Sequence, residues 1–131
     1  MAEASATLSD YRQSPRKVRL VADMVRGKSV AEAITALSFV PKRAALPIQK
    51  LLASAVANAK SRSLSDNLIV KEIGVDTGKI LYRRLPMSRG RAFVMRKRTS
   101  HVKVVLAESE LSPKKAKKAQ KAQKAKKEST E

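Results

Sequence analysis

The period of the hydrophobic pattern changes near Asn67, and this change constrains the fold more than any other feature of the sequence. Before Asn67, apolar residues recur every three or four positions, as on one face of an α-helix. After it they recur about every second position, as in a β-strand. The chain has 131 residues, enough for one domain with tails. The pattern therefore predicts an α+β domain, with helices first and an antiparallel sheet built around a hairpin after them.

Three helices are expected before residue 67. Ser14 suits the N-cap of the first helix, Pro15 suits its first position, and Gly27 ends it. The second helix stops before Pro41, and Pro47 marks either the beginning of the third or a bend within it. The faces predicted to be buried are Val18, Val21, Ala22 and Val25 in the first helix, Val30, Ala33, Ile34 and Leu37 in the second, and Ile48, Leu51, Leu52, Ala55, Val56 and Ala59 in the third.

Two β-strand segments follow, at residues 68–84 and 91–108, joined by "LPMSRG", whose proline and glycine favour a turn. In the first segment we expect Ile69, Ile73 and Val75 on one face and Val70 on the other. The hairpin, over about residues 68–107, exceeds the usual strand length of roughly 3–10 residues. A small three-helix core cannot cover it all, so its distal part should project. Residues 1–12 are either a flexible lead or a short edge strand.

The folded domain is predicted to end near residue 111. Residues 112–131 have eight lysines and no large apolar side chain, so they cannot contribute to a core. This composition predicts a basic C-terminal tail that is disordered in isolation.

Net charge limits the kinds of partner. Twenty-nine Lys and Arg residues against eleven Asp and Glu residues give a formal charge of +18. For a chain this basic, nucleic acid is the first partner to consider and an anionic membrane the second. The chain has no cysteine, no apolar run near the roughly 20 residues that span a bilayer, and no basic-then-apolar leader pattern. A cytoplasmic protein without disulfides or a membrane segment is expected.

Nothing in the sequence favours catalysis. His101 is the only histidine and has no clustered carboxylates near it, while Glu72 and Asp76 would lie about 13 Å apart on a strand. No metal-ligand spacing, phosphate-binding glycine loop or nucleophile motif is present. We therefore expect no enzyme activity, no cofactor, no metal and no small-molecule substrate.

Basic residues are concentrated where acidic residues are missing. Residues 77–107 contain six arginines, three lysines and no acid, and residues 33–65 also lack an acid. Arginine binds phosphate through a planar fork and stacks on bases, which a merely solubilising charge would not require. The candidate RNA-binding residues are Arg12, Arg16, Lys17, Arg19, Arg26, Lys28, Lys42, Arg43, Lys50, Lys60, Lys79, Arg83, Arg84, Arg89, Gly90, Arg91, Arg96, Lys97, Arg98, Thr99, Ser100 and His101.

Three segments carry a family resemblance: "SPRKVRLVADMVRGK" at 14–28, "LLASAVANAK" at 51–60 and "RGRAFVMRKRTSHVKVVL" at 89–106. In this order and spacing they resemble the bacterial form of the large-subunit ribosomal protein family numbered twenty-two, over roughly residues 10–107. The resemblance implies a small α+β domain on the outside of the large ribosomal subunit, near the polypeptide exit. It also implies binding to large-subunit ribosomal RNA, a role in early assembly, and neighbouring ribosomal proteins as partners.

The resemblance further implies that the hairpin reaches along the wall of the nascent-peptide tunnel and meets the nascent polypeptide. In that family, changes at the hairpin tip affect macrolide susceptibility and nascent-chain stalling. By position, the tip here consists of Arg84, Leu85, Pro86, Met87, Ser88, Arg89, Gly90, Arg91 and Ala92.

Two other classes of protein share parts of this pattern. A DNA-bending architectural protein also combines a small helical body with basic β-arms tipped by proline. A cationic membrane-surface protein would need an amphipathic helix with bulky apolar anchors, and the long Ala- and Leu-rich helix has no Trp or Phe. The DNA-bending protein is therefore the main alternative.

Overall fold

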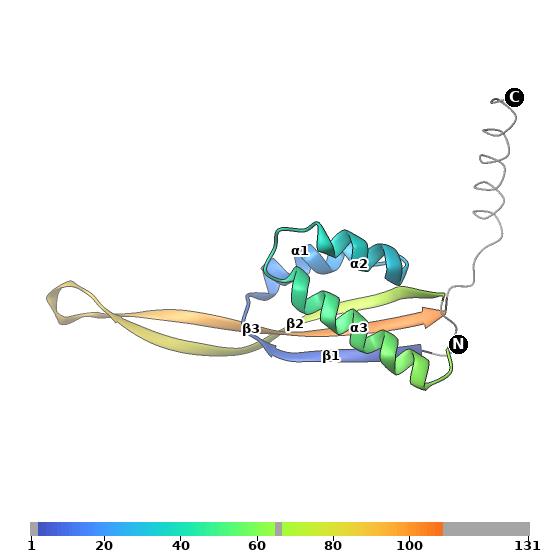
Figure 1. Cartoon of the computed structure of the whole chain (residues 1–131). Coiled ribbons are helices and arrows are strands. Elements are labelled where there is room, and N and C mark those ends of the chain that lie inside the picture. Colours follow the sequence, from blue (N-terminus) through green and yellow to red (C-terminus); the bar gives the residue numbers. More distant parts are fainter. Residues whose placement is uncertain (1–2, 65–66, 109–131) are drawn as a thin grey trace, which may run out of the picture.

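Three helices lie on one face of a three-stranded antiparallel sheet, and two of the strands run far beyond it (Figure 1). The computed structural model describes residues 3–64 and 67–108. The elements are β1 (Glu3–Tyr11), α1 (Pro15–Val25), α2 (Val30–Ser38), α3 (Ala45–Ser61), β2 (Leu68–Pro86), the short 3-10 helix η1 (Ser88–Gly90) and β3 (Ala92–Glu108). The predicted α+β class and the order of helices and hairpin are confirmed, while the predicted tail lies outside the described residues.

The strand order is β1-β3-β2, so β3 is the central strand. β1 pairs with the last part of β3, from Glu3 opposite Ala107 to Tyr11 opposite Ser100. The first residues are therefore an edge strand of nine residues rather than a flexible lead. The beginning of β1 and the end of β3 meet at the end of the body that is farthest from the hairpin tip (Figure 1).

The core lies between the helices and one face of the sheet, and its buried apolar members are all aliphatic. Val102, Val104 and Leu106 of β3 are fully buried at its centre. The predicted helix faces are confirmed, except that Ile34 and Val56 are half-buried at its margin. Burial of aliphatic surface contributes roughly 25 cal/mol per Å² to folding. This small core is what holds the base of the hairpin.

The predicted alternation in the first hairpin strand was wrong at Val70. Val70 is buried together with Ile73 and Val75, while Ile69 is only half-buried. The cause is a bulge between Val70 and Glu72, where the pairing register with β3 shifts. A bulge inserts one residue and reverses the alternation beyond it. Val70 and Ile73 therefore reach the same face although three positions separate them.

Both free edges of the sheet are covered within the body. Gly27 (φ 74°) turns the chain after α1, and its N–H donates to the Val70 carbonyl at 3.0 Å, while Val70 N–H donates to the Lys28 carbonyl. On the other edge, Asn58 Nδ2 and Arg62 Nη1 of α3 donate to backbone carbonyls of β1. Edge strands left unpaired invite pairing with other chains, so these contacts close the body.

α3 begins at Ala45, so Pro47 lies in its first turn. The first four N–H groups of a helix have no partner within the helix, and a proline there costs no hydrogen bond. The two alternatives left open for Pro47 are thus resolved in favour of a helix start.

Beyond the body, β2 and β3 pair only with each other. Seven register pairs, from Ile80 with Arg98 to Pro86 with Ala92, have no third strand beside them. At about 3.3 Å per residue this shaft is roughly 23 Å long. No residue from 76 to 98 is buried. The predicted projection of the distal hairpin is therefore present, and the protein's own core does not support it.

The hairpin leaves the body at a second bulge of β2, between Thr77 and Ile80. Thr99 Oγ1 donates to the Lys79 carbonyl at 2.7 Å across this bulge. A Cβ added to Gly78 would lie 2.4 Å from Thr99 Oγ1 and 3.0 Å from His101 Nε2. Only glycine fits at this position without moving the buried Thr99, so Gly78 fixes the geometry at the base of the shaft.

Gly78→Ala is expected to lower the free energy of unfolding by about 1–3 kcal/mol, because the new methyl group overlaps the Thr99 side chain. Gly74→Ala is the matched control on the same strand, where an added Cβ meets nothing within 4 Å. Urea unfolding followed by circular dichroism would measure both. Equal stability of the two variants would contradict this account of the bulge.

Candidate nucleic-acid interface

Exposed acids lie on the body of the protein and are missing from the hairpin shaft. Glu72 and Asp76 are exposed and stand opposite Val105 and His101, on the sheet face that no helix covers. Glu3, on the same face of β1, accepts a hydrogen bond from the Lys71 ammonium group, which lowers the pKa of the Glu3 carboxyl. Asp23 on α1 and Glu32 on α2 are also exposed, so the helical layer carries acids as well. The hairpin shaft has none, and a polyanion can approach it without meeting carboxylates.

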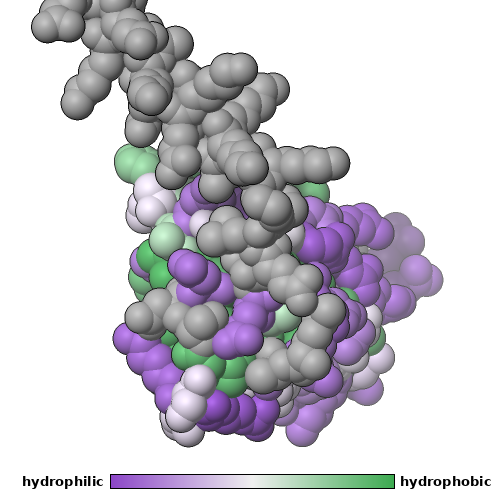
Figure 2. Space-filling view, turned by 90° about the vertical axis from the view of Figure 1, so that its right-hand side faces the viewer, coloured by the Kyte–Doolittle hydropathy of each residue, from purple (hydrophilic) through white to green (hydrophobic). Residues whose placement is uncertain are grey.

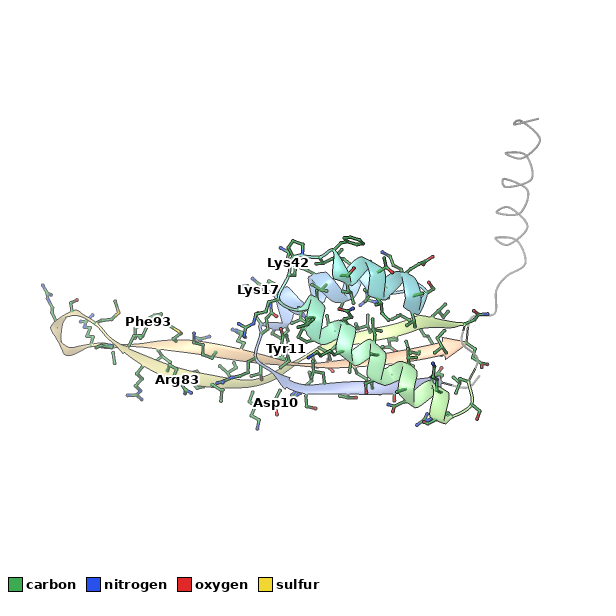
Figure 3. The ribbon with its side chains drawn as sticks, in the orientation of Figure 1. Asp10, Tyr11, Lys17, Lys42, Arg83 and Phe93 are labelled. Atoms are coloured by element: carbon green, nitrogen blue, oxygen red, sulfur yellow. The ribbon has the colours of Figure 1, made fainter. Side chains whose placement is uncertain are left out.

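Seven cations gather where the hairpin leaves the body. A cleft of about 670 Å³ opens there, and we name it the junction cleft. Its lining residues are Arg12, Gln13, Ser14, Lys17, Arg43, Arg83, Arg96, Lys97, Arg98 and Thr99. Figure 3 shows Lys17 and Lys42 at the end of the helical layer that faces the hairpin, with Arg83 and Phe93 farther out along the shaft.

A smaller cleft of about 350 Å³ adjoins the junction cleft. Ser14, Pro15, Arg16, Arg19, Thr77 and Arg98 line it. Ser14 and Arg98 border both clefts, so the two form a continuous basic surface from the first turn of α1 to the base of the shaft.

Three of the predicted RNA-binding arginines donate hydrogen bonds within the protein, and the acceptor of Arg83 is the carbonyl of the adjacent Tyr82. Arg19 donates from Nε and Nη2 to the Val75 carbonyl, at 3.2 and 2.9 Å. Arg26 donates to the Ile73 carbonyl and forms an ion pair with Asp23 at 2.9 Å. These contacts fasten α1 to β2, and Arg19 also lines the smaller cleft, whereas Arg26 lines neither cleft.

Three predicted residues at the base of β3 are enclosed by the protein. Thr99 and Ser100 are buried, and Ser100 Oγ forms no hydrogen bond within the part of the chain that is described. His101 is half-buried, and its Nδ1 accepts a hydrogen bond from the Asp10 N–H at 3.1 Å. Thr99 and Ser100 therefore shape the base of the hairpin from inside.

The hairpin tip is a tight turn whose side chains are all exposed. Arg89 (φ 58°) and Gly90 (φ 68°) both adopt left-handed backbone conformations, and Met87 N–H closes the turn by donating to the Arg91 carbonyl at 2.8 Å. Leu85 and Phe93 are paired across the strands and are exposed, so the tip region presents apolar as well as basic groups.

The remaining candidates are exposed but dispersed. Lys28 lies between α1 and α2, Lys42 follows α2, Lys50 and Lys60 lie along α3, and Lys79 lies in the second bulge of β2. They do not line the junction cleft. Figure 2, seen from the end opposite the hairpin tip, shows hydrophilic residues over most of the described surface, with a smaller hydrophobic region between them.

Comparison with known proteins shows the family of the chain. The family model for ribosomal protein L22p/L17e matches residues 6–107. The chain belongs to the ribosomal protein L22p/L17e family. The large ribosomal subunit protein uL22 of Geobacter sulfurreducens is 53% identical over 110 residues, which cover 82% of this chain and 99% of that protein. The uL22 proteins of Geobacter metallireducens and Pelobacter propionicus are 54% and 51% identical over 81% and 82% of this chain, and over 98% and 99% of their own lengths.

As a member of the L22p/L17e family, the chain is a ribosomal protein with a structural rather than an enzymatic role. Among its described residues, no group of three or more His, Cys, Asp or Glu side chains could hold a metal ion. Nor does any helix of the described part have the length and apolarity to cross a membrane.

Three polar residues of this ribosomal protein's basic surface were not predicted. Gln13 and Ser14 line the junction cleft and Thr77 lines the smaller one. Gln13 and Ser14 lie between Arg12 and Arg16 in "RQSPR", so proximity to basic residues was an available signal. Nothing in the sequence points to Thr77, because only the fold brings it beside α1.

Proposed function

We propose that this chain is a constituent of the large ribosomal subunit in the bacterial cytoplasm, where it binds large-subunit ribosomal RNA. We further propose that it aids assembly and lines the nascent-peptide exit tunnel with its hairpin. The observation that carries the RNA-binding part is the hairpin shaft. It is basic and free of acids, and it extends roughly 23 Å beyond the last third-strand contact. A shaft of this kind needs an anionic surface to hold it.

The contact should recognise RNA shape more than base sequence. The cations come from loops, helix ends and strands that are far apart in the chain, and they form a surface rather than a single helix sized for a groove. Phosphates neutralised by Lys and Arg release counterions, which provides affinity at any sequence. Folded RNA presents backbone in irregular arrangements that such a surface can follow.

The hairpin tip fits a tunnel wall because it has two kinds of surface. Arg84, Arg89 and Arg91 are exposed cations suited to RNA, while Leu85 and Met87 are exposed by 43% and 58%. We propose that the arginines hold the RNA wall and that the apolar side chains face the passing polypeptide.

Neighbouring ribosomal proteins are the partners that suit the exposed apolar residues of the body. Phe39 after α2, Leu20 on α1 and Leu46 on α3 are exposed by 81%, 62% and 61%. Large exposed apolar side chains on a small domain are typical of surfaces that other proteins cover.

Sedimentation of a cell extract tests the function directly. The tagged chain should migrate with the large ribosomal subunit in a sucrose gradient and remain there after DNase treatment. Migration with the nucleoid, abolished by DNase, would overturn the proposal in favour of a DNA-bending protein with basic β-arms.

Arg89→Ala combined with Arg91→Ala is expected to alter macrolide susceptibility or nascent-chain stalling while incorporation into the large subunit changes less than about twofold. The reason is that both residues lie at the end of the shaft, away from every contact with the body. Drug susceptibility, toe-printing on a stalling template and gradient sedimentation would measure the three quantities. Loss of incorporation with unchanged tunnel behaviour would show that the tip anchors assembly instead.

A further inference from the structure

We propose that the junction cleft binds consecutive phosphates of an RNA backbone and thereby fixes the hairpin relative to the body. This inference rests on the proposed function and goes further, because it assigns the main anchoring site to one place in the structure. The cleft, rather than the tip or the outer face of α3, would then supply most of the affinity for RNA.

The charge of the cleft is the first argument. Five arginines and two lysines line it, together with Gln13, Ser14 and Thr99, and no acid is among the lining residues. None of the three ion pairs formed within the described residues involves a lining cation. Like charges gathered in this way repel one another, and binding of a polyanion relieves the repulsion. The cleft therefore favours an anionic ligand over an empty state.

The wall of the cleft that belongs to the body is positioned before any ligand binds. The Tyr11 hydroxyl lies 2.8 Å from Gln13 Oε1 and 3.3 Å from the Arg43 carbonyl oxygen, so it ties the β1–α1 loop to the α2–α3 loop. Lys17 is held by the rigid first turns of α1, whose buried face packs in the core. A site with prearranged donors loses less conformational entropy on binding than a flexible one.

The shape of the cleft indicates a polymer rather than a free ion. Its volume, about 670 Å³, is far larger than a single phosphate needs, and it continues past Arg98 into the adjoining basic cleft. Arginine is the majority cation, and its planar fork suits the paired oxygens of a phosphodiester. A backbone segment can place successive phosphates along this path.

Occupation of the cleft has a mechanical consequence. Arg12, Lys17 and Arg43 belong to the body, whereas Arg83 and residues 96–98 belong to the shaft. A phosphate chain between them neutralises both walls at once. The direction of the shaft then depends on the RNA held at its base as well as on the bulge at Gly78.

The test uses the full-length chain and in-vitro-transcribed large-subunit ribosomal RNA, with binding measured by filter retention over a range of KCl concentrations. Lys17→Gln with Arg43→Gln removes two cleft charges whose side chains form no hydrogen bond or ion pair within the described chain. The control variant is Lys71→Gln with Lys103→Gln, which removes the same number of charges from the uncovered sheet face. Circular dichroism and thermal unfolding would verify that both variants fold.

The cleft variant should bind at least tenfold more weakly than the control variant at moderate salt. Its slope of log affinity against log salt should fall by about 1.4 to 1.8, from two cations at roughly 0.7 to 0.9 each. A folded cleft variant that binds like the control would overturn the inference and leave the proposed function standing. Wild-type protein that binds the RNA no more tightly than a DNA duplex would overturn both.

A competition experiment distinguishes a site for an RNA backbone from a site for single small anions. Inorganic phosphate, at ionic strength matched with KCl, should displace the RNA no better than chloride does. Displacement by millimolar phosphate from the wild type, but not from the cleft variant, would mean that the cleft selects single anions and would overturn the assignment to an RNA backbone.

Discussion

The aliphatic core ends where the hairpin leaves the body, and the rest of the structure depends on that limit. Val75 and Val102 are the last buried apolar residues of β2 and β3 on the way to the tip, and only Thr99 and Ser100 are buried beyond them. Past Ser100, which still pairs with Tyr11, the two strands have no third strand beside them among the described residues. An isolated two-stranded hairpin is marginally stable in water. Stability of the distal shaft must therefore come from outside the chain.

The distribution of charge indicates where that stabilisation comes from. Carboxylates are found on the uncovered sheet face, where Glu3 pairs with Lys71, and on α1 and α2, but the shaft has none. Seven cations line the junction cleft between body and shaft. An RNA surface would neutralise the cations of the shaft and those of the junction cleft at the same time. We therefore expect aliphatic burial to fold the body and phosphate contact to order the shaft in a separate step.

Much of the fold could be predicted from the sequence because its signals are local. The stripe from Val18 to Val25, Pro15 and Gly27 define α1, and the change of period near Asn67 separates helices from strands. The face of Val70 could not be predicted, because a bulge depends on pairing with β3 rather than on composition. For the same reason the sequence gives no signal for the close approach of Gly78 to Thr99.

The sequence could predict which types of residue form the candidate site, but not where in the fold they come together. Missing acids and abundant arginine identify the basic segments, yet only the fold brings Arg12, Lys17 and Arg43 opposite the shaft. Sequence also could not separate free cations from those engaged within the protein, as Arg19 is with the Val75 carbonyl. The burial of Thr99 and Ser100 was not evident from the sequence either, because it depends on the chain there still belonging to the body.

Amide hydrogen exchange tests most directly whether the shaft is ordered by RNA rather than by the protein. In the isolated chain, peptides from residues 101–107 should be strongly protected, while those from residues 83–98 should exchange nearly as fast as unstructured peptides. In the assembled large subunit, both should be protected. Full protection of residues 83–98 in the isolated protein would contradict the account, since the hairpin would then be stable without its partner.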